Sequence, residues 1–556
     1  MPASDPTLEV PILIVGGGPV GLALASDLGM RGASCLVIEQ GDGSTEHPRA
    51  TALNSRSMEF MRRWGIAKAV HAAAAPDDFP HTALYCTSFT GYEIARIERP
   101  SHGGREPIRH SPERPQRCNQ LFLDPILSRL AGSFETVTIR HHCRLESVEQ
   151  AADHVIATAH DGANGRPLRI AAQYVVDCSG GRSVIRPALG IEIRGSAYVG
   201  YFLSIFVRAP QLWTHHAMGK AALVTFVDAK GLWRNLVSLD GRELYRLGVT
   251  GKEYYDAPER VDAEALFRAA VGKDVPHEIL SVRRWMARNV VADRYRHGRI
   301  FLAGDAAHLN HPAAGLGLNT GLGDAVDLGW KLSAVLAGWG GARLLDSYEP
   351  ERRPVGIRNI AHADVSHANE RTQPTHPEIA LDTPAGAQAR RVMGEELVRV
   401  QRRRVITDGL ALGYQYAASP IVCGDGPPPP PSSSMEYHPT SFPGSRAPHG
   451  WLAEARSTLD LFGNAFTLLR LGTSAPQPSA MERAFAARGV PINTVSIADP
   501  AIAALYERAL ILVRPDGHVA WRGDRLPTDP LSIVDHVRGA DTPAAASGAD
   551  VTQARP

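Results

Sequence analysis

A glycine-rich turn between two short apolar segments near the N-terminus constrains the fold more than any other feature. Residues 16–21 read Gly-Gly-Gly-Pro-Val-Gly and match the GxGxxG pattern. The apolar run at 10–15 predicts a buried strand, and the run at 20–30 has apolar residues at helical spacing. A second apolar strand at 34–39 completes a β-α-β unit. This unit predicts an α/β fold with a parallel, Rossmann-like sheet.

Length and charge narrow the class of protein. A chain of 556 residues is too long for one hydrophobic core and predicts roughly two to four domains. Its 59 basic and 58 acidic residues argue against nucleic acid or a membrane surface as a partner. The six cysteines form no CxxC pair and no zinc-ligand spacing, so we expect no metal site and a cytoplasmic location. Neither a signal peptide nor a membrane span is expected.

The glycine pattern predicts a dinucleotide site. Gly16 permits the tight turn, Gly18 lets a pyrophosphate approach the backbone, and Gly21 lets the helix pack on the strand. Glu39 ends the second strand, where a carboxylate accepts bonds from ribose hydroxyls and repels a ribose phosphate. The dinucleotide is therefore FAD or NAD rather than NADP. The predicted contacts are Gly16, Gly18, Pro19, Val20, Gly21, Glu39 and Gln40.

A second signature follows a strand pattern at 299–303. This strand ends in Gly304-Asp305, and a glycine-rich stretch leads from Pro312 into a long helical pattern at 319–336. A stretch rich in glycine lets a flat ring lie close to the backbone. The residues of this stretch that we expect at the cofactor are Gly304, Asp305, Pro312, Gly315, Gly317, Leu318 and Asn319.

The two signatures together resemble the group A flavoprotein aromatic hydroxylases, the para-hydroxybenzoate hydroxylase superfamily. More narrowly, the chain is similar to the phenol and aromatic-polyketide hydroxylases that carry a C-terminal thioredoxin-like domain. The resemblance implies FAD, with Asp305 on the ribityl chain and the loop after Pro312 facing the pyrimidine edge of the flavin. Helix N–H groups there can stabilise the negative charge of reduced flavin.

Two further segments match this family in part. Arg117 and Gln120 resemble a flavin-contacting segment at a helix start. The loop at 47–50 resembles one whose arginine, here Arg49, lies near the flavin and the transient nicotinamide cofactor. The residues predicted to be catalytic are Arg49 and Pro312.

A motif at 176–186 departs from the family pattern. Where the family has Asp-Gly, this chain has Ser179-Gly180, and Asp177 lies two residues earlier. The family aspartate is linked to both FAD and NAD(P)H contacts. Either the change weakens binding of the reductant, or Asp177 substitutes for the missing carboxylate through a local shift.

The sequence pattern and the family resemblance together imply five segments. Residues 1–190 and 286–425 form the two parts of the FAD-binding domain, the second with a helical region, and 191–285 form a β-rich substrate domain. A Pro/Ser-rich linker at 426–440 leads to a thioredoxin-like domain at 441–545, which has no CxxC pair and no dithiol chemistry. The candidate apolar lining of the substrate pocket is Trp213, Phe226 and Trp233.

The resemblance implies an FAD-dependent monooxygenase. It would use NAD(P)H and O2 to hydroxylate a phenolic or polycyclic aromatic substrate by way of a C4a-hydroperoxyflavin, as a homodimer or a monomer. NADH and NADPH are both open as the reductant. Two alternatives are a Baeyer–Villiger or epoxidising flavin monooxygenase that acts on a quinone or polyketide, and a flavin-binding protein without catalysis.

Overall fold

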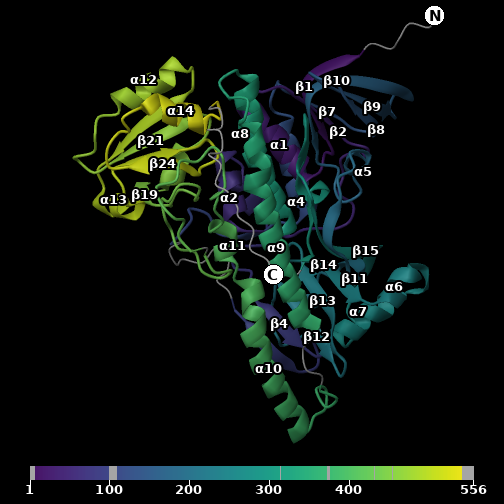
Figure 1. Ribbon diagram of the computed structural model, residues 1–556. Coiled ribbons are helices and arrows are strands. Elements are labelled where there is room, and N and C mark those ends of the chain that lie inside the picture. Colours follow the sequence, from purple (N-terminus) through teal and green to yellow (C-terminus); the bar gives the residue numbers. More distant parts are fainter. Residues whose placement is uncertain are drawn as a thin grey trace, which may run out of the picture.

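The computed structural model describes residues 7–98, 109–312, 315–371, 376–430, 432–453 and 455–540. Residue 431 of the expected linker and residues 541–545 of the expected last domain lie outside the described residues. Figure 1 shows two large sheets on one side of the long helices α8 (Gly317–Leu336) and α9 (Tyr348–Arg371), and a smaller sheet on the other side. No helix in the described ranges is both long and apolar enough to cross a membrane.

The first large sheet confirms the predicted Rossmann-like fold. Its parallel strands run in the order β17-β10-β1-β2-β7, and the antiparallel strands β16, β8 and β9 extend it. The β-α-β unit of the sequence consists of β1, α1 and β2. The elements are β1 (Leu8–Val15), α1 (Pro19–Met30), β2 (Cys35–Ile38), β7 (Val137–Arg140), β8 (Cys143–Gln150), β9 (Val155–Asp161), β10 (Arg166–Asp177), β16 (Arg296–His297) and β17 (Ile300–Leu302).

The second sheet has eight strands in the order β18-β15-β11-β14-β13-β12-β4-β5. Their bounds are β4 (Ala83–Cys86), β5 (Glu93–Ile97), β11 (Ile193–Arg208), β12 (Leu223–Asp228), β13 (Gly231–Ser238), β14 (Leu244–Thr250), β15 (Glu278–Ala292) and β18 (His308–Leu309). Strands β4 and β5 lie outside the expected 191–285 segment, and β4 joins the sheet by parallel pairing with β12. The sheet is therefore assembled from three separate stretches of the chain.

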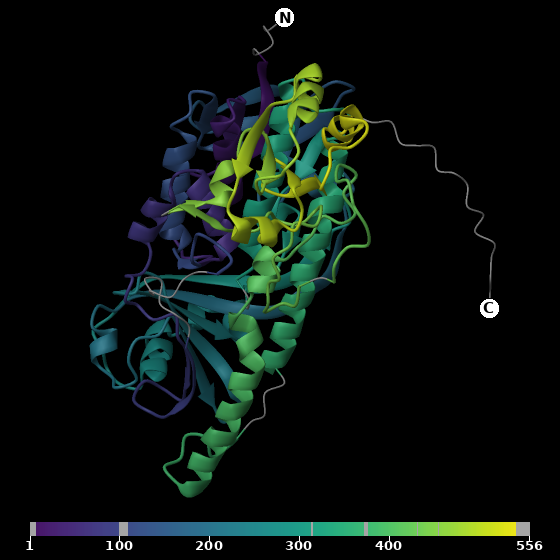
Figure 2. The same cartoon turned by 90° about the vertical axis from the view of Figure 1, so that its left-hand side faces the viewer.

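Helices cover the second sheet on both faces. Helix α7 (Ala263–Val271) covers one face with an apolar cluster that includes Phe226 and Phe267. Helix α10 (Pro384–Val405) covers the opposite face only at β4, β5 and β12, where Met393 packs near Tyr85. Figure 2 shows α9 and α10 running past this sheet. On the rest of that face, Phe206 of β11 and Val237 of β13 are buried in a separate apolar cluster that includes Leu121.

The C-terminal region forms a four-stranded sheet in the order β22-β21-β23-β24. It confirms the predicted thioredoxin-like unit. Its elements are β21 (Phe466–Leu471), α12 (Ser479–Ala487), β22 (Ile492–Ile497), α13 (Pro500–Tyr506), β23 (Leu510–Val513), β24 (Val519–Gly523) and α14 (Pro530–Val537). The remaining short elements are β3 (Ala52–Leu53), α2 (Ser55–Arg63), α3 (Ala67–Ala73), β6 (Gln116–Arg117), α4 (Gln120–Ala131), α5 (Ile185–Ala188), α6 (Lys252–Asp256), α11 (Asp408–Leu412), β19 (Trp451–Ala453) and β20 (Arg456–Ser457).

This region does not stand apart from the rest of the chain. Trp330 and Ala334 of α8 share one apolar cluster with Phe466, Leu468 and Phe485. The sequence predicts a separate small domain after the proline run, whereas the packing joins it to α8. Burial of large aromatic side chains across a boundary contributes strongly to stability, so the two parts stabilise each other.

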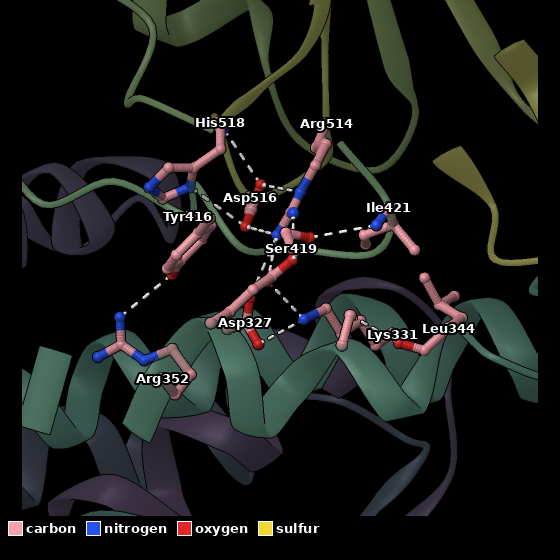
Figure 3. A network of polar contacts seen from close by, with 12 residues as sticks. Asp327, Lys331, Leu344, Arg352, Tyr416, Ser419, Ile421, Arg514, Asp516 and His518 are labelled. Carbon is pink, nitrogen blue, oxygen red and sulfur yellow. Dashed lines mark hydrogen bonds and ion pairs between the residues drawn. The ribbon is translucent and has the colours of Figure 1, made fainter. Parts of the chain in front are cut away.

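Buried charges cross the same boundary. The carboxylates of Asp327, Glu351 and Asp516 lie within 4.8 Å of one another. Arg514 donates to Glu351 at 2.7 Å and to Asp516 at 2.6 Å, and Lys331 donates to Asp327 at 2.7 Å (Figure 3). Burial raises the pKa of the Asp327 carboxyl well above its usual range, so the two cations balance the charges of the other two carboxylates. Removing one partner of such a buried network leaves an uncompensated charge, which is strongly destabilising.

Candidate active site

The glycine fingerprint has the geometry that the sequence predicts. Gly16 has a φ of +106°, and a Cβ added to it would lie 2.5 Å from the carbonyl oxygen of Cys178. A Cβ on Gly21 would lie 2.0 Å from the carbonyl oxygen of Gly16. By contrast, no atom of the described chain lies within 4 Å of a Cβ on Gly18. Gly18 begins α1 without a side-chain cap, so the first N–H groups of α1 can bind an anion such as a pyrophosphate.

Glu39 lies against this turn. Its carboxylate accepts hydrogen bonds from the N–H of Gly17 at 2.7 Å and from the N–H of Gly41 at 2.8 Å. A carboxylate has about four acceptor positions, so both oxygens can also accept bonds from sugar hydroxyls. Gln40 beside it is exposed. The backbone bonds hold Glu39 at the end of β2, where the ribose of a dinucleotide would lie.

The Gly304-Asp305 turn meets the fingerprint in space. Gly304 has a φ of +60°, and a Cβ on it would lie 2.9 Å from Cγ2 of Val20 in α1. Asp305 lies at the start of α8, with its Oδ1 3.9 Å from a Cβ on Gly317. Desolvation by the surrounding protein raises the pKa of the Asp305 carboxyl, and the charges of His308 and Arg49 partly offset this rise. The side chain nevertheless keeps accessible surface. Asp305 is thus an acceptor next to two helix starts.

The start of α8 is fastened to the rest of the site by Asn319. Its Oδ1 accepts from the N–H of Asn54 at 2.9 Å, and its Nδ2 donates to the carbonyl oxygen of Ala52 at 2.9 Å. Gly315, with a φ of +62°, lies close to Ala52. The side chain of Asn319 is therefore occupied by backbone groups of this chain. Asn319 thus holds the loop, and its expected contact with the cofactor stays a prediction.

The other predicted residues of this stretch surround the helix start. Gly317 and Leu318 are half-buried in the first turn of α8, and Pro312 is exposed. The two residues between Pro312 and Gly315 lie outside the described residues. The roles expected for Pro312, Gly317 and Leu318 stay predictions.

The segments around Arg49 and Gln120 come together, as the sequence predicts. The N–H of Gln120 donates to the carbonyl oxygen of Ala50 at 3.0 Å, and Arg117 in β6 pairs with Ala52 in β3. The charge of Arg49 acts at the Gly304-Asp305 turn, where it lowers the pKa of Asp305. Both segments therefore lie beside the proposed flavin position.

His47 connects this loop to the second sheet. Its Nδ1 lies 2.8 Å from Oγ of Ser281, and its Nε2 lies 2.9 Å from Oγ of Ser204. Burial, together with the smaller effect of the nearby charges of Arg246, Arg283 and Arg49, lowers the pKa of His47 to about 4. His47 is therefore neutral at pH 7, in a cationic environment. In the sequence it stands out only as a neighbour of Arg49, and nothing marks Ser204 or Arg246.

Alternating residues divide the second sheet into two faces. On β11, Leu203 and Ile205 lie in the cluster under α7, whereas Ser204 and Phe206 point the opposite way. Leu121 at the start of α4 packs with Phe206, so the face of Ser204 is the one next to the flavin segments. We call this the inner face, and the face under α7 the outer face.

The three expected lining residues lie on the outer face. Phe226 is fully buried there, with its ring edge-on to Phe89 at 5.4 Å. Trp213 packs against Tyr245 at 5.5 Å, and Trp233 joins the same cluster beside a β-bulge. The structure does not bring Trp213, Phe226 and Trp233 together with the cofactor residues. The expectation is corrected: Phe226 and Trp233 point from their strands into the core under α7, and Trp213 packs there from the 3-10 turn at Leu212–Thr214.

The motif at 176–186, which differs from the family pattern, contains a buried carboxylate. Asp177 is fully buried at the end of β10, and its Oδ1 accepts from the N–H of Ser179 at 3.0 Å and from the hydroxyl of Ser179 at 2.5 Å. The hydroxyl of Ser183 donates to its other oxygen. Burial raises the pKa of Asp177, against the effect of these bonds. The carboxylate is held inward, so Asp177 supports the turn and leaves the Ser179 hydroxyl at its surface.

The fold and this site define a class of protein, the FAD-dependent oxidoreductases with a Rossmann-like domain. Family models agree with this class and are more specific. Residues 9–363 match the model described as FAD binding domain, and residues 440–539 match the one described as aromatic-ring hydroxylase, C-terminal. The chain belongs to this family of flavin-dependent aromatic-ring monooxygenases, and it uses FAD with NAD(P)H as reductant.

Relatives match over nearly the whole chain. Tetracenomycin B2 monooxygenase-dioxygenase of Streptomyces olivaceus is 32% identical, over 95% of this chain and 98% of the relative. The solved structure of the rebeccamycin biosynthetic enzyme RebC with reduced flavin is 42% identical with a TM-score of 0.90, and the match covers 97% of this chain and 100% of RebC. Aklavinone-11 hydroxylase, solved with FAD and aklavinone, is 28% identical with a TM-score of 0.81, over 96% of this chain and 100% of that one.

Proposed function

We propose that this enzyme hydroxylates a planar polycyclic aromatic substrate that carries an anionic group, and that the substrate binds on the inner face of the second sheet. The observation that carries the proposal is the cationic environment of His47, to which Arg49, Arg246 and Arg283 contribute. Solved relatives support the polycyclic class, since RebC has been seen with bound 7-carboxy-K252c and aklavinone-11 hydroxylase with aklavinone.

The residues that would hold FAD fit the cofactor. The N–H groups at Gly18 would bind the pyrophosphate, Glu39 a ribose, and Asp305 the hydroxyl chain next to the flavin ring. Bound FAD supplies the redox chemistry that activates O2 with electrons from NAD(P)H. Arg49 and Pro312 stay our proposed catalytic residues, because the charge of Arg49 acts on Asp305 and Pro312 precedes α8.

The inner face would orient the substrate. Arg246 would pair with its anionic group, while Phe206 and Val237 would pack against the ring system and exclude water. The neutral imidazole of His47 is held between Ser204 and Ser281, so it would keep the Arg49 loop at a fixed distance from the sheet. In this proposal residues 191–285 supply most of the substrate wall, and residues 1–190 and 286–425 supply the flavin site.

A substrate panel tests the proposal. The FAD-loaded enzyme would be supplied with NADH or NADPH, O2 and three sets of compounds: simple phenols, neutral polycyclic aromatics and polycyclic aromatic carboxylates. We expect the fastest coupled NAD(P)H oxidation with the carboxylates, with a product heavier by one oxygen atom and little hydrogen peroxide. Ring-expanded or epoxide products would instead favour the Baeyer–Villiger or epoxidising alternative. Oxidation of NAD(P)H that is the same with and without every compound contradicts hydroxylation of this class.

We also propose a cytoplasmic homodimer. Large apolar side chains are exposed along α9 and α10, where Val365 is 55% exposed and Val392 is 41% exposed. Exposed apolar surface of this kind is typical of interfaces between subunits. All six cysteines are free, which suits a reducing compartment. Light scattering on the purified protein tests the assembly, since a mass near that of one 59.9 kDa chain contradicts the dimer.

A further inference from the structure

Asp324 lies behind the Gly304-Asp305 turn, in the second turn of α8. Its carboxylate is fully buried. Oδ2 accepts a hydrogen bond from the N–H of Gly304 at 3.1 Å and another from Nε2 of His308 at 2.8 Å, and Oδ1 accepts from Nε of Arg352 at 2.8 Å. One oxygen atom of Asp324 therefore binds both ends of the turn that carries Asp305.

The charge on Asp324 strengthens these bonds. Burial alone would raise the pKa of its carboxyl, but Arg352 and His308 hold the pKa below its usual range. The carboxylate is ionised at neutral pH, so its bonds are charge-assisted and stronger than neutral ones. Because an ionised carboxylate only accepts, Nε2 of His308 carries the proton.

The turn depends on outside support. Gly304 adopts a left-handed backbone conformation, with a φ of +60°, in close contact with Val20. The side chain of Asp305 itself leaves this turn toward the surface that we assign to FAD. Its direction is therefore set by how Gly304 and His308 are held.

We propose that Asp324 is a positioning residue, which orients Asp305 toward FAD by clamping the two ends of this turn. The proposal rests on the placement of FAD against Asp305 that is proposed above. Asp324 itself acts through Gly304 and His308. Loss of the Asp324 carboxylate would allow the turn to relax and Asp305 to move. A small displacement of Asp305 would remove much of its contribution to FAD binding.

Arg352 extends the clamp to the C-terminal domain. Its Nη1 donates to the hydroxyl of Tyr416 at 3.1 Å, and its Nη2 donates to the carbonyl oxygen of Thr320 at 2.9 Å. The ring of Tyr416 lies 4.2 Å from that of His518 in the C-terminal domain, and Figure 3 shows Tyr416 between Arg352 and His518. The C-terminal domain, which has no dithiol of its own, thus packs directly behind the flavin turn.

Asp327 is a matched control one turn further along α8. It is buried like Asp324 and is bonded by Lys331 at 2.7 Å and Arg514 at 3.2 Å. None of its contacts in the described chain is to Gly304 or His308. Asp324→Asn and Asp327→Asn therefore make the same substitution at buried positions of the same helix, but only the first removes the clamp.

The test uses the full-length protein. Titration with FAD gives the dissociation constant, the absorption spectrum reports the flavin environment, and spectroelectrochemistry gives the midpoint potential. We expect Asp324→Asn to raise the Kd for FAD by about tenfold and to change both the flavin spectrum and the potential. Asp327→Asn should lower the melting temperature to a similar degree, with a Kd within about twofold of wild type. Equal changes in Kd for the two variants, or no change for Asp324→Asn, overturn the proposal.

Two further variants keep the test decisive. If Asp324→Asn does not fold, His308→Ala and His308→Gln replace it. His308→Gln keeps a donor for Asp324 and should keep a Kd near that of wild type, whereas His308→Ala should raise it severalfold. Equal Kd values for these two contradict the clamp. Asp305→Asn separates the two proposals, because an unchanged Kd in that variant contradicts the placement of FAD rather than the role of Asp324.

Discussion

The two faces of the second sheet carry similar residue types but differ in what those residues contact. Both faces carry a phenylalanine, an arginine and a histidine whose pKa is lowered to about 4. On the outer face, Phe226 is fully buried under α7, and His216 stacks on Phe89 at 4.2 Å. On the inner face, His47 is bonded to two serines and surrounded by three arginines. The outer face is built for packing and the inner face for contact with a ligand.

The difference follows from which helix reaches which face. Helix α7 closes the outer face with apolar side chains. Helix α10 stops short on the inner face, so β11, β13 and β14 meet the Arg49 loop and the start of α4 instead. An aromatic residue in this sheet therefore indicates a substrate wall only if its strand position directs it inward.

The largest expected effect is the loss of stability when the core of the outer face is disrupted. Phe226→Ala should lower the free energy of unfolding by about 3–5 kcal/mol, because it leaves a cavity in a closed core. The same change at Phe206 on the inner face should cost less stability and raise KM for the substrate. Denaturant unfolding and steady-state kinetics check both variants. A raised KM in a Phe226→Ala protein that is still folded would return Phe226 to the substrate wall.

The next largest effect compares Arg246 on the inner face with Arg234 on the outer face. Arg246→Gln should lower kcat/KM for an anionic aromatic substrate by roughly 10- to 100-fold, because a charge-assisted contact is lost. Arg234 on the outer face donates to the carbonyl oxygen of Leu266, so Arg234→Gln serves as the matched control. It should change stability and leave kcat/KM close to that of wild type. Equal losses of kcat/KM in both variants contradict a functional division between the faces.

The fold and the cofactor side were predictable because their signals are local. Gly16 and Gly304 both need a backbone conformation that favours glycine, so each leaves a mark at its own position in the sequence. The strands of the last domain also carry their own apolar pattern. Such features depend on neighbouring residues, and the structure reproduces them nearly residue for residue.

The substrate side and the clamp depend on contacts that are distant along the chain. The direction of Phe226 depends on pairing with β4 and on a bulge beside Trp233, neither of which has a sequence signature. In the sequence, Asp324 is one of several polar residues in a mainly apolar helix, and nothing there indicates that it binds Gly304 and Arg352. Register and long-range pairing decide these roles.

A third prediction concerns acid stability. Burial and three arginines hold the pKa of His47 near 4, against an ordinary value of 6.5. As the pH falls below 6.5 the unfolded chain binds a proton at this position and the folded chain does not, so stability is lost toward pH 4. His47→Gln should remove on the order of 1–2 kcal/mol of this loss while keeping bonds to the serines. Urea unfolding at pH 6.5 and pH 4.5 checks this, and an identical loss in both proteins contradicts a neutral, buried His47.

The smallest expected effect is a change of pKa with salt concentration, which distinguishes why the pKa values of His47 and His216 are lowered. Burial comes first for both histidines, but three arginines also act on His47, whereas only Lys273 acts on His216. Raising the ionic strength from 0.01 M to 1 M shortens the screening length from about 30 Å to about 3 Å. The pKa of His47 should then rise by roughly 0.3–0.5, and that of His216 by less. NMR titration of labelled histidines at both salt concentrations measures this, with His47→Gln and His216→Gln assigning the signals. If the two pKa values respond equally to salt, the cationic character of the inner face is too weak to select an anionic substrate.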